Sequence, residues 1–141
     1  MKHLVIGLVA LGLAGCSMPE PVFKASSTTP TETISVTAES LWQEYKTNPV
    51  RAEETMKNKR VRMTGTLLAI TPNNDKSVGL SFAANEQDGD HFVFVVFPES
   101  FRPQVAELNP KQTVTVEGTF KRHDRVFVAQ TLTFDGSAIL K

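Results

Sequence analysis

The chain has 141 residues, with 15 Lys and Arg against 15 Asp and Glu, so its formal net charge is zero. A balance this close to neutral gives the protein as a whole no electrostatic attraction to nucleic acid or to anionic lipid. The only cysteine excludes a disulfide within the chain, and the length suits one domain held together by its hydrophobic core.

Residues 1–15 have the pattern of an export signal. Lys2 gives a basic start, an apolar stretch covers residues 4–14, and small residues precede Cys16. The apolar stretch is too short to span a bilayer as a helix, which takes about 20 residues. Two other interpretations stay open at this point, a buried helix of a cytosolic protein and an ordinary secretory signal with an incidental cysteine.

The last residues of this segment, Leu13, Ala14, Gly15 and Cys16, resemble the lipobox of bacterial lipoproteins. The resemblance implies cleavage before Cys16, diacylglycerol on its thiol and acylation of the new amine. Stable anchoring needs more than one acyl chain, which this processing supplies. Ser17 in place of Asp resembles the outer-membrane class of enterobacterial lipoproteins. We expect a lipid-anchored protein of the bacterial cell envelope, on the outer membrane and facing the periplasm.

Residues 16–35 are predicted to hold the lipidated cysteine and a flexible tether. Pro, Ser and Thr dominate this segment and no apolar period runs through it. An ordered strand that docks on the domain is the alternative. Cleavage before Cys16 would also remove Lys2, and the mature chain would then have one more acidic than basic residue.

Two helices are predicted next, opening a domain that spans residues 36–141. Thr37 is a suitable N-cap, and the residues that follow it at helical spacing are Ala38, Leu41, Trp42 and Tyr45. We expect Trp42 and Tyr45 to seal this helix against one end of the domain. A second, short helix follows, with Asn48 as its cap, Pro49 at its first position and Asn58 suited to a left-handed end.

From residue 59 the hydrophobic period changes to two, which predicts strands. The expected strands cover residues 59–69, 77–82, 91–97, 112–120 and 125–134, with a short helix or turn over 99–108. Strand 91–97 is apolar on both faces, so both should be covered. Gly65 would permit a bulge in the long first strand. Five strands with a helical segment between the third and fourth predict a mainly β protein, a five-stranded OB-fold barrel preceded by an N-terminal helical segment.

Several short motifs, in this order and spacing, resemble the tRNA-anticodon-like OB-fold family of bacterial lipoproteins. They are Ala52, Met-Lys-Asn-Lys at 56–59, Val-Arg-Met-Thr-Gly at 61–65 and Val-Thr-Val-Glu-Gly at 114–118. The resemblance covers residues 36–134. Many members have Gly where this chain has Asn58. The family's function is generally unassigned, so the resemblance implies a fold and a location and assigns no functional residue.

A candidate binding face follows from the way OB-folds bind, over the second and third strands and the loops that flank them. The face is predicted from basic and aromatic residues that should lie there: Arg60, Arg62, Lys121, Arg122, His123, Arg125 and Phe127. Residues 121–125 are expected to form the loop between the fourth and fifth strands. Basic groups beside aromatic rings suit a sugar chain, an anionic protein surface or single-stranded nucleic acid. A solvated turn over core aromatics is the competing interpretation.

Catalytic and metal-binding groups are sparse in the sequence. Asp88, Gly89 and Asp90 are typical of a hairpin turn rather than of a cation loop, which needs carboxylates at regular offsets. His123 and Asp124 are adjacent, so their side chains should diverge. We therefore expect no enzyme, metal or cofactor, and no nucleic acid. The predicted function is a binding or adaptor module for a protein partner or an envelope glycan; a structural or stress-related protein without a ligand and an envelope hydrolase are the alternatives.

Overall fold

The computed structural model describes residues 32–84, 91–126 and 129–140. Its strands are β1 (Thr33–Thr37), β2 (Arg60–Pro72), β3 (Val78–Ala83), β4 (His91–Phe97), β5 (Thr113–Val126) and β6 (Ala129–Leu140). Its helices are α1 (Ala38–Thr47), α2 (Pro49–Met56), the 3₁₀ turn η1 (Glu99–Phe101) and α3 (Arg102–Val105). None of the helices in these ranges combines the length and apolarity needed to cross a bilayer.

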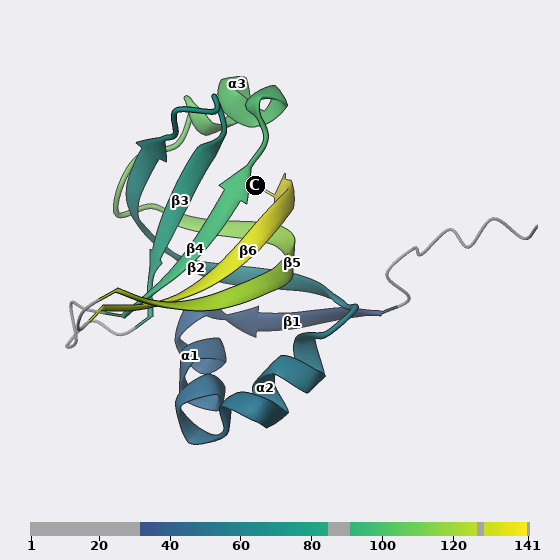
Figure 1. Cartoon of the computed structure of the whole chain (residues 1–141). Helices are drawn as coiled ribbons and strands as arrows, with labels where there is room; N and C mark the ends of the chain where they lie inside the picture. The colour runs from purple at the N-terminus through teal and green to yellow at the C-terminus, as the bar shows by residue number, and fades with distance from the viewer. Residues whose placement is uncertain (1–31, 85–90, 127–128, 141) are drawn as a thin grey trace, which may run out of the picture.

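Five of the strands close into a barrel, which confirms the predicted mainly β OB-fold. The strand order is β1-β2-β3-β4-β6-β5, and antiparallel pairing of β2 with β5 closes the ring. Strands β4 and β6 run parallel, while the other barrel pairs are antiparallel. Helices α1 and α2 lie together at one end of the barrel and α3 lies at the other (Figure 1).

Strand β1 corrects the predicted end of the tether. Residues 33–37 pair in parallel with β2, from Thr33 opposite Arg60 to Thr37 opposite Thr64. Ile34 and Val36 pack against the core, whereas the alternate Thr and Ser side chains are exposed. This period of two was hidden in a Thr- and Ser-rich segment. The ordered alternative is therefore correct for residues 33–35; Cys16 and the rest of the proposed tether lie outside the described residues.

The first two helices form where the capping pattern placed them. Thr37 Oγ1 accepts from the Ser40 backbone N–H at 3.0 Å, and the Ser40 hydroxyl accepts from the Thr37 N–H at 3.0 Å, which completes a capping box. Asn48 caps α2 by accepting from the Arg51 N–H, and Asn58 has a φ of 58°, as expected for a left-handed end. Trp42 and Tyr45 are buried at the barrel end, 3% and 7% exposed.

The first barrel strand differs from the predicted pattern beyond its midpoint. Val61, Met63 and Leu67 are buried as expected, but Ala69 is exposed and Ile70 packs against the core instead. A register shift between Leu67 and Ala69 exchanges the two faces, since one extra residue inverts the alternation. The irregularity therefore falls after Gly65. Gly65 itself lets α1 approach, because a Cβ there would lie 2.9 Å from the Cβ of Ala38.

The last two strands are longer than predicted, and this corrects the expected binding loop. Residues 121–125 belong to β5 and pair with β6, with Arg122 opposite Thr133 and Arg125 opposite Gln130. These residues are charged but include no Gly, Pro or Asn that would end a strand, so the ladder continues through them. The ladder ends with Val126 opposite Ala129, and Phe127 lies outside the described residues.

Candidate binding faces of the barrel

The basic residues that were predicted to share one binding face lie in three separate places. Arg60 and Arg62 are on β2 and meet the carboxylate of Glu117 on β5. Arg62 donates from Nε at 2.8 Å and from Nη2 at 2.6 Å to Oε1 of Glu117, and Arg60 Nη1 lies 3.8 Å from Oε2. Both arginines thus belong to the junction that closes the barrel.

Lys121 and Arg122 lie on β5 and are both paired with acidic residues. Lys121 Nζ donates to Asp135 Oδ1 at 3.1 Å, and Arg122 Nε donates to Asp124 Oδ2 at 2.7 Å. The Thr133 hydroxyl also donates to Asp124 Oδ2, at 3.1 Å. The hydrogen bond from Arg122 is the main cause that holds the pKa of Asp124 below its usual value, and the same bond raises the pKa of Arg122. This part of β5 therefore presents fixed, paired charges.

His123 and Arg125 lie on the opposite side of the same strand and approach α1. The imidazole of His123 packs on the ring of Tyr45, with the two ring centroids 4.8 Å apart and the planes at 40°. A cleft of about 540 Å³ opens beside this contact. Its lining comes from α1, the start of α2 and the β5–β6 hairpin: Trp42, Tyr45, Lys46, Pro49, His123, Arg125 and Gln130.

Strand β4 supplies the aromatic part of the barrel's outer face. Val93, Val95 and Phe97 are fully buried, so the alternate residues Phe92 and Phe94 point outward and are half-buried. The ring of Phe94 lies over Gly79 of β3, where a Cβ would overlap it. In register, Phe94 stands opposite Ser81 on one side and Thr133 on the other.

These neighbours make a continuous strip across the outer face. It runs from Gly79 and Ser81 on β3 through Phe94 on β4 to Thr133 on β6 and the Arg122–Asp124 pair on β5; we call it the Phe94 strip. The ring occupies the space that the missing side chain of Gly79 leaves, and the polar groups beside it are hydrogen-bonded to one another. The strip therefore offers an apolar, half-buried ring next to oriented polar groups.

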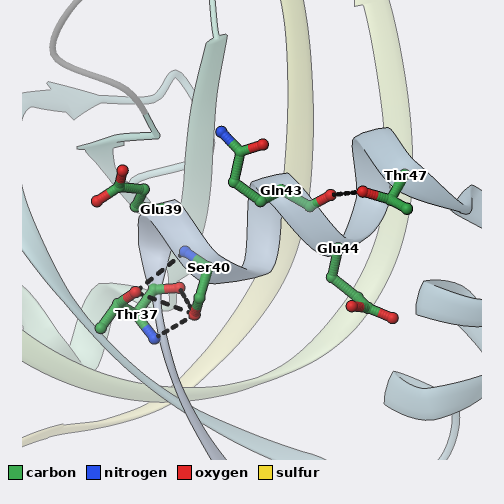
Figure 2. A pocket seen from close by; sticks show the side chains of 6 residues that line it. All are labelled: Thr37, Glu39, Ser40, Gln43, Glu44 and Thr47. Carbon is green, nitrogen blue, oxygen red and sulfur yellow. Dashed lines mark hydrogen bonds between the residues drawn. The ribbon is translucent and has the colours of Figure 1, made fainter.

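A shallow depression of about 400 Å³ along α1 is explained by the helix itself (Figure 2). Its residues come from one segment, Thr37, Glu39, Ser40, Gln43, Glu44 and Thr47. Thr37 and Ser40 are used in the capping box, and the Thr47 hydroxyl donates to the Gln43 carbonyl at 2.8 Å (Figure 2). Glu44 pairs with Arg51 of α2 at 2.8 Å. These groups serve the two helices.

Sequence reasoning missed Lys46, Pro49 and Gln130, which join His123 and Arg125 only in three dimensions. The proximity of the only Trp and the only Tyr to Lys46 on α1 was the one local signal. Within the described ranges no group of three or more His, Cys, Asp or Glu is placed to hold a metal ion. Asp88, Gly89 and Asp90, which were predicted to form a hairpin turn rather than a cation loop, lie outside those ranges.

Comparisons with known proteins agree with this architecture. The model of the tRNA_anti-like family matches residues 4–132. A crystal structure of a "putative nucleic acid-binding lipoprotein" from Klebsiella pneumoniae subsp. pneumoniae MGH 78578 superposes with a TM-score of 0.58 at 17% identity, covering 77% of this chain and 92% of that one. Asparaginyl-tRNA synthetase of Entamoeba histolytica gives a TM-score of 0.42 at 15% identity, covering 58% of this chain and 20% of the synthetase chain. No curated protein matches the sequence.

Proposed function

Because this chain belongs to the tRNA_anti-like family and has its OB-fold, we propose that it is a lipid-anchored, non-enzymatic binding module of the bacterial envelope that holds an envelope glycan on the Phe94 strip. The half-buried ring of Phe94 over Gly79, beside the hydrogen-bonded Thr133, Asp124 and Arg122, is the observation that carries the proposal. The second and third strands of OB-folds bind oligosaccharides and oligonucleotides, and here they are β3 and β4.

The chemistry of the strip favours a sugar among these ligands. A sugar ring has one face of C–H groups, which fits an aromatic plane, and hydroxyl groups at its edge, which fit fixed donors and acceptors. Specific small-ligand sites generally combine an apolar wall with a few well-placed polar groups. Arg122 and Asp124 supply one donor and one acceptor group whose charges offset each other.

Nucleic acid is the competing ligand, since the name of the Klebsiella structure mentions it. Binding a phosphate backbone requires cations that are free to neutralise it. Lys121 and Arg122 are both paired with carboxylates, and Arg60 and Arg62 share Glu117 elsewhere on the barrel. The described outer face therefore lacks the unpaired basic stripe that a polyanion needs.

The lipid anchor rests on residues 1–16 and is supported by the lipoprotein name of the same structural relative. Growth with an alkyne-bearing fatty acid, followed by coupling to a fluorophore, should label the full chain. Cys16→Ser should abolish the label and leave an uncleaved precursor, while Ser17→Ala should keep it. Labelled protein in the outer-membrane fraction supports the proposed location. Labelling that survives Cys16→Ser would refute the anchor.

The glycan assignment can be tested with detergent-solubilised, full-length protein and soluble oligosaccharides released from envelope glycans. Calorimetry should show saturable binding that weakens at least tenfold in Phe94→Ala and in Arg122→Ala. Leu68→Ser is the matched control, because Leu68 is 42% exposed and lies on β2, outside the strip. Circular dichroism checks that each variant is folded.

Other outcomes decide among the alternatives. Phe94-dependent binding of a single-stranded oligonucleotide, or of a protein recovered by crosslinking from residue 94, would replace the glycan. If neither oligosaccharide nor oligonucleotide binds and crosslinking from residue 94 recovers no protein, a structural or stress-related role is left. For an envelope hydrolase, the pair His123–Asp124 is unsuitable, because His123 packs on Tyr45 while Asp124 is bound to Arg122 and Thr133 across the strand.

A further inference from the structure

The cleft between α1 and the β5–β6 hairpin collects positive charge. Lys46 and Arg125 line it, and among the residues that the structure describes no Asp or Glu does. Eight other Lys and Arg residues of the described ranges form ion pairs, whereas Lys46 and Arg125 form none there. Two cations beside an apolar wall, with no carboxylate paired to them in the described ranges, create a local positive potential.

His123 adds a buried polar atom that lacks a partner. Its Nε2 is inaccessible to solvent and has no hydrogen-bond partner in the part of the chain that the structure describes. Buried polar atoms are almost always hydrogen-bonded, and an exception calls for a ligand, a water or another explanation. His123 lines the cleft, but Nε2 itself is closed to solvent, so a ligand oxygen or a water could accept from a protonated Nε2 only after the surrounding side chains shift.

The floor of the cleft is aromatic and fixed. Trp42 and Tyr45 stack on each other with centroids 6.0 Å apart and planes at 19°, and both are buried. The Tyr45 hydroxyl donates to Glu53 Oε1 at 3.0 Å, which ties the ring to α2. Gln130, opposite Arg125 in the ladder, adds an amide. The donors therefore stand on rigid elements, as a preformed site requires.

From this arrangement we infer that the cleft is a second ligand site, which binds a small oxyanion, a carboxylate or a phosphate group, between Lys46, His123 and Arg125. Arg and Lys both bind such groups, Arg in a two-pronged geometry. The site is separate from the Phe94 strip, because His123 and Arg125 alternate along β5 with Arg122 and Asp124, which face the other way. It stands whether or not a glycan binds the strip.

Trp42 is the only tryptophan, so its fluorescence reports on this cleft alone. Sodium phosphate and sodium acetate, titrated into the full-length protein at constant ionic strength set by sodium chloride, are the probes. We expect a saturable change in Trp42 emission with at least one of them. Saturation by phosphate identifies a phosphoryl ligand class, and saturation by acetate identifies a carboxylate class.

Substitutions locate the binding. Arg125→Gln and Lys46→Gln should each weaken it at least fivefold. The control that removes a charge elsewhere is Lys111→Gln, whose lysine also lacks an ion pair in the described ranges. This variant should bind as the parent does. Absence of saturation with both anions, or equal weakening by Lys111→Gln, would overturn the inference. Near-ultraviolet circular dichroism confirms that the cleft variants keep the Trp42–Tyr45 packing.

Discussion

Arg62 directs two guanidinium nitrogens at one carboxylate oxygen of Glu117, which joins β2 to β5 at the seam of the barrel. The Glu117 side chain is only 9% exposed, whereas that of Arg62 is 47% exposed. Loss of the ion pair would therefore cost the buried carboxylate of Glu117 more than the guanidinium of Arg62, since water can hydrate a freed Arg62.

Removing Glu117 should cost more than removing either arginine. We expect Glu117→Ala to lower the free energy of unfolding by about 1–2 kcal/mol, discounted for the exposure of Arg60 and Arg62. Urea denaturation measures it, and a double-mutant cycle with Arg62→Ala isolates the coupling. The exposed helix pair Arg51–Glu44 is the control and should give a coupling near zero. A similar coupling for both pairs would contradict this account.

Gly118 should not tolerate a side chain. A Cβ at this position would lie 2.7 Å from the backbone oxygen of Asp135, and a paired strand cannot easily move away. Gly118→Ala should destabilise the fold by about 1–3 kcal/mol, the range of overpacking. Thr119→Ala, at the exposed next position, should leave the urea midpoint unchanged. A midpoint for Gly118→Ala that equals the parent's would show that the β5–β6 contact is loose.

Tyr45 should ionise only in strong alkali. Burial is the main cause that raises its pKa to about 12, and the hydrogen bond to Glu53 and the charge of Glu53 add to it. It is the only tyrosine, so phenolate absorbance during a pH titration reports it directly. Glu53→Gln should lower the pKa while leaving it above the ordinary value, because burial persists.

The same shift makes the stability of the fold depend on alkaline pH. The unfolded chain loses the tyrosine proton near pH 10, the ordinary value, while the folded chain keeps it up to about 12. The contribution of the neutral phenol to stability is therefore complete below pH 10 and is lost as pH rises to about 12. In Glu53→Gln the loss of stability should begin at the same pH, and it should be smaller because the folded pKa of Tyr45 is lower in this variant. A parent phenol that titrates at its ordinary pKa would show that Tyr45 is not held as described.

Asp124 should make the stability of the fold depend on acid pH, whereas Tyr45 makes it depend on alkaline pH. Its pKa is lowered mainly by the hydrogen bond from Arg122 and further by Thr133, so its contribution to stability is present above the unfolded pKa and lost as pH falls through the folded pKa. Carboxyl-carbon NMR should show Asp124 titrating below its ordinary range. In Arg122→Ala the pKa should rise toward that range, and in Lys121→Ala it should change little. If the pKa of Asp124 were unchanged in Arg122→Ala, the hydrogen bond from Arg122 would not be the cause of the lowered pKa.

Local patterns predicted most of the fold. The capping residues Thr37 and Asn48, and strand β4 with its apolar faces, are where the sequence indicated. The errors came where a pattern was ambiguous within one segment. Residues 33–37 alternate but are rich in Thr and Ser, which also suit a linker, and residues 121–125 are charged, which also suits a loop.

The candidate sites could not be read from local patterns, because their residues meet only after the barrel closes. Arg60 and Arg122 are both basic, yet one shares Glu117 and the other binds Asp124. Adjacent residues His123 and Asp124 face opposite sides because they lie in a strand rather than a turn. Burial and pairing partners, which decide whether a charge is free to bind a ligand, depend on contacts across dozens of residues.

Strand β1 has a mechanical consequence for an anchored protein. If Cys16 carries the proposed anchor, the polypeptide that leads from it reaches the first strand of the fold at Thr33, where β1 begins. A pull from the membrane would act first on this strand and on its parallel ladder with β2. Tension along the strand axis loads all the hydrogen bonds of such a ladder together, whereas tension across it breaks them one at a time. β1 would thus serve as a shear clamp that keeps mechanical load away from α1 and the cleft behind it.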